Sequence, residues 1–312
     1  MCPLVKASVG ARLGRTCPFF RIADMYVGET TCDGKKKAYE ILGKDVPMHI
    51  MDVPQMKREK DIVKWKDEIA DFAKVVEDFT GNKVTPEKLA EAIKICNEKR
   101  KAMQRVYDCR KSKCLPISGR DALLMTQIPS LMIRYVVLRC VTAWLTNWSS
   151  ASKMVYMSFR KEQKRILITG TPLAVPNWKL HNIIETSGAA VVCEEMCTGQ
   201  DTSKTLLMNL AKTLDEQFMN LSRRYMKTNC ACFTPNTGRI DDILRMVDEY
   251  QVDGVIDCSL MFCCLYDTEK RAVAEALKEK NIPVLSLETD YTDTDAEQLR
   301  TRIGAFVEML SK

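Results

Sequence analysis

The chain has 312 residues, of which 46% are hydrophobic, so it is long enough for two folded domains and too apolar for a disordered protein. Lysine and arginine total 47 against 41 acidic residues, and the resulting net charge of +6 is not gathered into a long basic run, which argues against a nucleic-acid-binding protein. The N-terminus lacks the charged and apolar regions of a secretory signal, so we expect a cytoplasmic protein.

Residues 1–125 predict an incomplete N-terminal α/β domain. The stretch FRIADMYVGETTC (20–32) predicts a strand leading to a helix capped by Asp33, and VPMHIMDVP (46–54) predicts a strand bounded by prolines. Residues 57–114 are charged with a helical period, which predicts two long helices packed antiparallel. A domain of this kind that opens on Cys2 is short of strands, and we expect its true beginning to be missing.

Residues 126–163 predict an atypical connection between domains. Its apolar stretch LMIRYVVLRCVTAWLTNW (131–148) contains Arg134 and Arg139. Each arginine would cost roughly 2.5–3.5 kcal/mol near a bilayer centre, and the apolar runs between them are too short to span. We therefore predict no membrane segment.

Residues 164–312 predict a complete C-terminal α/β domain. Apolar runs alternate with helical segments, and the runs are RILITG (165–170), AAVVCEEMCTG (189–199), VDGVIDCSLMFCC (252–264) and IPVLSLETD (282–290). This alternation predicts a parallel, doubly wound sheet. The predicted fold class is α/β, with two Rossmann- or flavodoxin-like domains that have parallel sheets and are linked by long helices.

The chain contains 14 cysteines but no C-x-x-C pair. A long cytoplasmic chain is a poor candidate for a disulfide scaffold. Metal binding or redox chemistry is therefore the more specific interpretation of these cysteines. One set of cysteines lies at the carboxyl ends of predicted strands, where open α/β sheets bind ligands. This set is Cys32, Cys193, Cys197, Cys230, Cys232, Cys258, Cys263 and Cys264. We interpret Cys96, Cys109, Cys114 and Cys140 as structural residues.

The stretch TTCDGKKK (30–37) places Cys32 before a predicted helix and three lysines, which favours negative charge at that position. Taken alone, the stretch is more simply a helix start with a solvated face. The two histidines, His49 and His181, are interpreted as structural. No acid–base or nucleophile constellation is recognisable, so the catalytic residues are unknown.

Several separate motifs then resemble one family. The segments CPLVKAS, RTCPFF and GETTCDGKKKAYEIL, and later RILITGTP, EEMCTG, NCACFTPN, EYQVDGVID, LSLETDY and DAEQLRTRIGAFVEML, resemble double-cubane cluster proteins. These proteins belong to the superfamily of 2-hydroxyacyl-CoA dehydratases and benzoyl-CoA reductase subunits. The resemblance covers roughly residues 2–122 and 164–312.

The resemblance implies an oxygen-sensitive, anaerobic iron–sulfur reductase with two [4Fe–4S] cubanes joined by a sulfide. An ATP-hydrolysing iron–sulfur activator would supply low-potential electrons for a small, hard-to-reduce substrate, and a homodimer is expected. The ligands implied by residue-by-residue matching are Cys2, Cys17, Cys32, Cys197, Cys232 and Cys263, with Cys230 as a substitute for Cys232.

Two alternatives stay open beside the double-cubane reductase. A 2-hydroxyacyl-CoA dehydratase subunit would carry one [4Fe–4S] cluster, and the matches at Cys17 and Cys197 speak against it. A non-catalytic or degenerate cluster-bearing relative is the second, because the chain begins at the first ligand itself and residues 126–159 depart from the family pattern.

Overall fold

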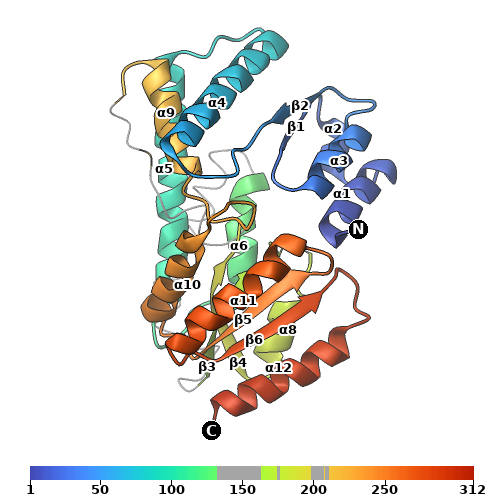
Figure 1. Cartoon of the computed structure of the whole chain (residues 1–312), viewed down its shortest axis with the longest axis vertical. Helices are drawn as coiled ribbons and strands as arrows, with labels where there is room; N and C mark the ends of the chain where they lie inside the picture. Colours follow the sequence, from blue (N-terminus) through green and yellow to red (C-terminus); the bar gives the residue numbers. More distant parts are fainter. Residues whose placement is uncertain (132–162, 174–175, 198–206, 208–210) are drawn as a thin grey trace. The chain divides into compact units, whose positions relative to one another are not determined.

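The computed structural model describes residues 1–131, 163–173, 176–197, 207 and 211–312. The chain divides into two compact units that are interleaved in sequence (Figure 1). Unit 1 comprises Met1–Lys94, Leu207–Asn236 and Leu260–Cys263, and unit 2 comprises the remainder. The domain boundaries that we derive from the sequence stay predictions, and most of the atypical connection at 126–163 lies outside the described residues.

Unit 1 contains a small parallel sheet and several helices. Its elements are α1 (Pro3–Leu13), α2 (Pro18–Ile22), β1 (Tyr26–Glu29), α3 (Asp33–Leu42), β2 (Met48–Met51), α4 (Glu59–Thr80) and α9 (Leu214–Tyr225), together with the first turns of α5 (Pro86–Cys109). Strands β1 and β2 pair in parallel, with Tyr26 opposite Met48. The two strands predicted in this region are therefore confirmed, in shorter form.

Local sequence explains where the longer helices of unit 1 begin and end. Helix α4 stops at Gly81, whose φ of 71° is the left-handed conformation that glycine adopts without a side-chain clash. Helix α9 begins with a capping box, because the Thr213 hydroxyl accepts a hydrogen bond from the Glu216 amide and the Glu216 carboxylate accepts one from the Thr213 amide. Helix α4 packs mainly on α9, not on α5 as the predicted antiparallel pair requires.

Unit 2 is built around a four-stranded sheet in the order β4-β3-β5-β6. Its elements are the rest of α5, α6 (Gly119–Leu131), β3 (Lys164–Gly170), α8 (Lys179–Thr186), β4 (Ala189–Glu195), α10 (Thr237–Tyr250), β5 (Gly254–Leu260), α11 (Cys264–Glu279), β6 (Val284–Thr289) and α12 (Ala296–Leu310). Strand β3 pairs in parallel with both β4 and β5. Parallel sheets in both units confirm the α/β fold class.

Helices cover both faces of the unit 2 sheet (Figure 1). Helices α8 and α12 bury one face with side chains such as Ile184 and Ile303, while α10 and α11 bury the other with side chains such as Met246 and Leu277. Strands buried on both faces must be nearly continuous apolar runs, which is how they read in the sequence.

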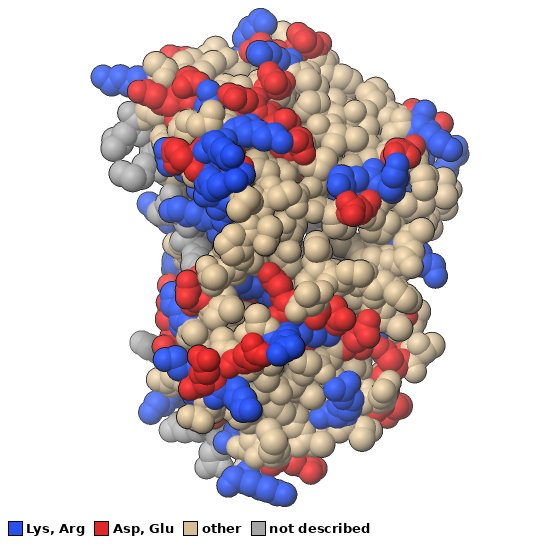
Figure 2. All heavy atoms as spheres, in the orientation of Figure 1, with Lys and Arg blue, Asp and Glu red and all other residues tan. Residues whose placement is uncertain are grey.

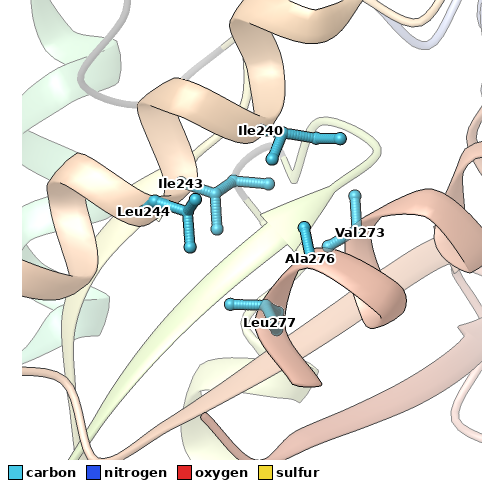
Figure 3. Close-up of a pocket in the computed structure, with 6 residues that line it drawn as sticks. All are labelled: Ile240, Ile243, Leu244, Val273, Ala276 and Leu277. Atoms are coloured by element: carbon cyan, nitrogen blue, oxygen red, sulfur yellow. The ribbon is translucent and has the colours of Figure 1, made fainter. Parts of the chain in front are cut away.

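Helices α10 and α11 meet through an apolar contact (Figure 3). The side chains that form it are Ile240, Ile243, Leu244, Val273, Ala276 and Leu277, and they leave no room for a water molecule between them. Close packing of this kind holds the two helices together on one face of the sheet.

On the face shown in Figure 2, lysine and arginine side chains alternate with acidic ones. No helix within the described residues has the length and apolar character to cross a membrane.

Candidate metal centre

The three N-terminal cysteines share one structural role. Cys2, Cys17 and Cys32 are the N-cap residues of α1, α2 and α3, and none of their side chains makes a capping hydrogen bond. All three residues are half-buried, and none of them is paired in a disulfide. A helix N-terminus presents unpaired amide N–H groups and favours negative charge, so these positions suit thiolate ligands.

The structure corrects two expectations about Cys32. Strand β1 ends at Glu29, three residues before Cys32, and the N-cap of α3 is Cys32 itself, not Asp33. The chain leaves the strand early because Thr31 turns back to Glu29 through a backbone hydrogen bond of 2.9 Å.

The lysines after Cys32 each have a carboxylate partner. Lys36 pairs with Asp33 at 2.7 Å, and Lys37 pairs with Glu40 at 2.7 Å. Lys35 pairs with Glu29. The lysine run is thus a charged helix face that is compensated by neighbouring acids, which agrees with the simpler interpretation of this stretch.

Cys230 and Cys232 lie in the loop that follows α9, not at the end of a strand as the sequence predicts. Cys232 is buried in an apolar cluster with Val53 and Phe233, and Cys230 lies half-buried beside it. The loop is held by Lys57, whose ammonium donates to the Thr228 carbonyl at 2.6 Å and lies 4.6 Å from the centre of the Phe233 ring.

Cys263 and Cys197 follow strands, as predicted. Cys263 comes three residues after β5, and its amide donates to the Leu260 carbonyl at 3.0 Å. The residue before it, Phe262, has a φ of 63°, which is rare for an aromatic residue and turns the chain sharply ahead of α11. Cys197 comes two residues after the end of β4 and is half-buried.

The fold gathers most of the candidate ligands into one unit. Unit 1 contains Cys2, Cys17, Cys32, Cys230, Cys232 and Cys263, and unit 2 contains Cys197. Thiolates are the donors that iron–sulfur clusters require, so the chemical type of these residues fits such a cluster. Within the described residues, no three Cys, His, Asp or Glu side chains lie close enough together to hold a metal ion. The ligand assignment stays a prediction.

Two cysteines lie inside strands and differ from the candidate ligands. Cys193 in β4 and Cys258 in β5 are fully buried, and burial raises the pKa of Cys258 to about 12 and that of Cys193 further. Thiols in this environment stay protonated and are poor ligands. Cys96 is exposed on α5, while Cys140 lies outside the described residues.

Sequence reasoning missed a buried charged cluster at the carboxyl edge of the unit 2 sheet. Arg239, near the start of α10, is 1% exposed. Its guanidinium donates to Glu195 at 3.1 Å, to Glu269 at 2.8 Å and to the Thr169 hydroxyl at 2.8 Å. Burial opposes the charge of Arg239, but Glu195, Tyr266, Asp257 and Glu269 together outweigh burial and leave the arginine pKa raised. Acidic residues at the ends of apolar runs, as in VVCEE, were the available signal.

Asp257 of β5 belongs to this cluster but has no hydrogen-bond donor among the described residues. It is 1% exposed, and its carboxylate lies 4.0 Å from the Arg239 guanidinium. Burial raises the pKa of Asp257 to about 6, although Arg239 and Lys270 partly offset the effect of burial.

A second buried ion pair joins the residue that follows α5 to β4. Arg110 donates to both carboxylate oxygens of Glu194, at 2.6 and 2.9 Å, and also to the Val191 carbonyl at 2.9 Å. The His181 ring lies 3.2 Å from the same carboxylate and is fully buried. Such a network positions helices on the sheet, which agrees with a structural role for His181. In unit 1, His49 stacks on Phe72 with ring centres 5.3 Å apart.

Comparison with known proteins decides the family. The family model described as "2-hydroxyglutaryl-CoA dehydratase, D-component" matches residues 1–310. The chain belongs to this family. It is a dehydratase-like subunit, and the superfamily resemblance drawn from its cysteine motifs is confirmed.

Three individual proteins are similar in sequence to this chain over most of its length. YjiM of Escherichia coli (strain K12), which is named as a dehydratase subunit, is 33% identical over 317 residues, covering 99% of this chain and 80% of the relative. A benzoyl-CoA reductase subunit of Thauera aromatica is 22% identical and covers 78% of this chain and 62% of the relative. The (R)-phenyllactyl-CoA dehydratase beta subunit of Clostridium sporogenes is 24% identical and covers 75% and 60%. The chain thus spans less than two thirds of the last two relatives.

Proposed function

We propose that this chain is the iron–sulfur subunit of a low-potential reductase with two sulfide-bridged [4Fe–4S] cubanes. An ATP-hydrolysing activator protein would deliver the electrons, and the substrate would be a small molecule that is hard to reduce. The proposed ligands are Cys2, Cys17, Cys32, Cys197, Cys232 and Cys263, with Cys230 as a substitute for Cys232.

The observation that supports this proposal is the shared position of the three N-terminal thiols. Cys2, Cys17 and Cys32 come from three separate helix starts, yet all belong to unit 1 and all are half-buried N-cap residues without a capping bond. A structural N-cap is normally Ser, Thr, Asp or Asn, whose oxygen satisfies an amide of the first turn. Three thiols in that role suggest a selected ligand function and not a capping function.

When bound, such a cluster pair would supply electron transfer at low potential. The chain's own residues would hold the thiolates and control access to them. Lys57 holds the loop of Cys230 and Cys232 through its bond to Thr228, and Phe233 covers the same loop with an apolar ring. Burial and hydrogen bonding around the sulfurs are the means by which a protein sets the potential of a cluster.

The dehydratase alternative is favoured by a different observation, namely the family match and the name of a relative. The phenyllactyl-CoA dehydratase subunit acts, by its name, on a CoA thioester, and so does the benzoyl-CoA reductase subunit. In this alternative the chain carries one [4Fe–4S] cluster, and Cys17 and Cys197 are not ligands. The degenerate alternative predicts no cluster at all.

Substitutions of single cysteines separate these functions. We would reconstitute the full chain anaerobically and compare the iron content of Cys17→Ala, Cys32→Ala and the control Cys96→Ala, which changes an exposed thiol on α5. The double cubane predicts that both ligand variants lose iron while the control retains it. Retention of all iron in Cys17→Ala contradicts the double cubane and favours the dehydratase.

Activator dependence and assembly follow from the same proposal. Reduction of the reconstituted chain by an iron–sulfur ATPase of the activator type should require ATP hydrolysis, as followed by the bleaching of visible absorbance. The homodimer should give twice the chain mass of 35.5 kDa in light scattering. Reduction that is equally fast without ATP contradicts the activator, and a monomeric mass contradicts the dimer.

A further inference from the structure

Unit 1 contains a cavity of about 420 Å³ among α1, α3 and the two-stranded sheet. Protein interiors are normally packed without voids much larger than a water molecule. Pockets for small ligands have volumes of roughly 300–1,000 Å³. The size of this cavity is therefore that of a ligand site and exceeds that of a packing defect.

The lining of the cavity is mainly hydrocarbon. Its walls include Val5, Tyr26, Ala38, Tyr39, Leu42 and Met48. All but Met48 are less than 9% exposed, so the walls are fixed by the core of unit 1. Tyr39 packs against Gly28, where an added Cβ would lie 2.6 Å from the tyrosine ring, and this contact sets the position of the ring. A ligand that fills the space must have an apolar body.

The hydroxyl groups of the lining already have partners within the protein. The Ser8 hydroxyl donates to the Leu4 carbonyl at 2.9 Å, and the Tyr39 hydroxyl donates to the Glu29 carbonyl at 3.0 Å. The Tyr26 hydroxyl donates to the Phe20 carbonyl at 2.8 Å. A ligand rich in hydroxyl or amide groups would find few partners here.

Lys35 is the charged residue among those that line the cavity. Its side chain is 29% exposed and pairs with Glu29, whose side chain is 44% exposed. Burial opposes the charge of Lys35, but the hydrogen bond and charge of Glu29, together with Tyr39, outweigh burial and leave the pKa of Lys35 raised, so the ammonium is charged at neutral pH. The Glu29 carboxylate is already partly exposed. Water can therefore hydrate it when another carboxylate takes its place at Lys35.

We propose that this cavity is a binding site for a small apolar monocarboxylate. The hydrocarbon part occupies the cavity, and the carboxylate replaces that of Glu29 at the Lys35 ammonium. Apolar burial supplies most of the affinity, and the charged hydrogen bond selects an acid over the corresponding neutral molecule. This inference is independent of the iron–sulfur proposal, because it requires no cluster.

Calorimetric titration of the full chain with sodium octanoate tests the site. Lys35→Met keeps the apolar stem and removes the charge, and we expect about tenfold weaker octanoate binding from the loss of a charged hydrogen bond. Lys37→Met is the matched control, since Lys37 lies on the same helix but is largely exposed and does not line the cavity. Ser8→Phe should abolish binding because its ring occupies the cavity.

A second ligand separates the role of the charge from that of the hydrocarbon. Octan-1-ol has the same chain without the carboxylate, so it should bind more weakly than octanoate and should be unaffected by Lys35→Met. Thermal unfolding of each variant confirms that it is folded. Absence of saturable octanoate binding, or octanoate binding that is equally strong in Lys35→Met, Ser8→Phe and the unchanged chain, would overturn the proposal.

Discussion

The guanidinium of Arg110 forms two parallel hydrogen bonds with the carboxylate of Glu194, and both side chains are fully buried. One partner lies just after α5 and the other on β4, so the pair fixes the end of a helix to the sheet of unit 2. Paired charges in an interior depend on one another, because either one left alone is a desolvated charge without compensation.

Arg110→Met should therefore lower the free energy of unfolding by about 3–5 kcal/mol, since it leaves Glu194 buried without its main partner. Replacing both residues with methionine should restore part of this loss. Urea unfolding followed by circular dichroism measures both effects. Arg271→Ala, which breaks an exposed pair with Glu275, is the control and should change little. An equal loss in the single and double variants would contradict the coupling.

Glu194 also makes stability depend on acid. Burial alone would raise its pKa, but Arg110 and His181 outweigh burial and hold the pKa at about 2, below the unfolded value of 4.5. The folded state then binds the proton less readily than the unfolded state, so this stability is present above about pH 4.5 and is lost as the pH falls toward 2. The acid sensitivity of unfolding should be smaller in the double methionine variant.

Asp257 has the opposite effect, because burial raises its pKa to about 6 from 3.8. The folded state holds the proton more tightly than the unfolded state, so stability from this group is present below about pH 4 and is lost as the pH rises through 6. Arg239 and Lys270 favour the charged carboxylate, while Glu269 and Asp267 oppose it. Asp257→Asn should raise the free energy of unfolding by about 2–3 kcal/mol at pH 7.5. A gain of the same size at pH 4 would contradict this account.

Gly170 ends β3 with a φ of 123°, and an added Cβ would lie 2.0 Å from the Cys258 carbonyl oxygen. Gly170→Ala should lower the free energy of unfolding by about 3 kcal/mol or more, because backbone cannot move aside cheaply. Gly304→Ala is the matched control in α12, where nothing lies within 4 Å of the new Cβ. The control should gain about 0.5–1 kcal/mol from helix propensity. A larger loss from the control than from Gly170→Ala would contradict the packing argument.

Thiol reactivity should follow burial. Cys193 and Cys258 have raised pKa values and no access to solvent, so iodoacetamide should not modify them in the folded chain at pH 8. Cys96 is exposed and should react readily. Peptide mass spectrometry reads each site, and rapid labelling of Cys258 in the folded protein would contradict its burial.

The sequence predicts the sheet of unit 2 well because β4 and β5 are buried throughout and β3 is buried along most of its length. RILITG and AAVVCEEMCTG locate β3 and β4 within a few residues, since a short, nearly continuous apolar run is typical of a buried strand. The N-terminal region is harder, because α1 and α2 are short and have weakly patterned sequences. The N-cap position of Cys2 and Cys17 could not be predicted, since cysteine is not a usual capping residue.

The candidate site could likewise be predicted from the sequence only in part. Motif matching identifies which cysteines to consider, but the predicted order of strands and helices places Cys230 and Cys232 after a strand when they follow α9. The partners of Arg239 come from β3, β4 and α11, and no local pattern relates them. Long-range pairings of this kind depend on the assembled sheet.

The most direct test of the account is the iron and acid-labile sulfide content of the full chain, reconstituted and purified without oxygen. Two bridged cubanes predict about eight irons per chain. About four irons would replace the double cubane with the dehydratase alternative. A folded chain that binds no iron would contradict the proposed iron–sulfur function.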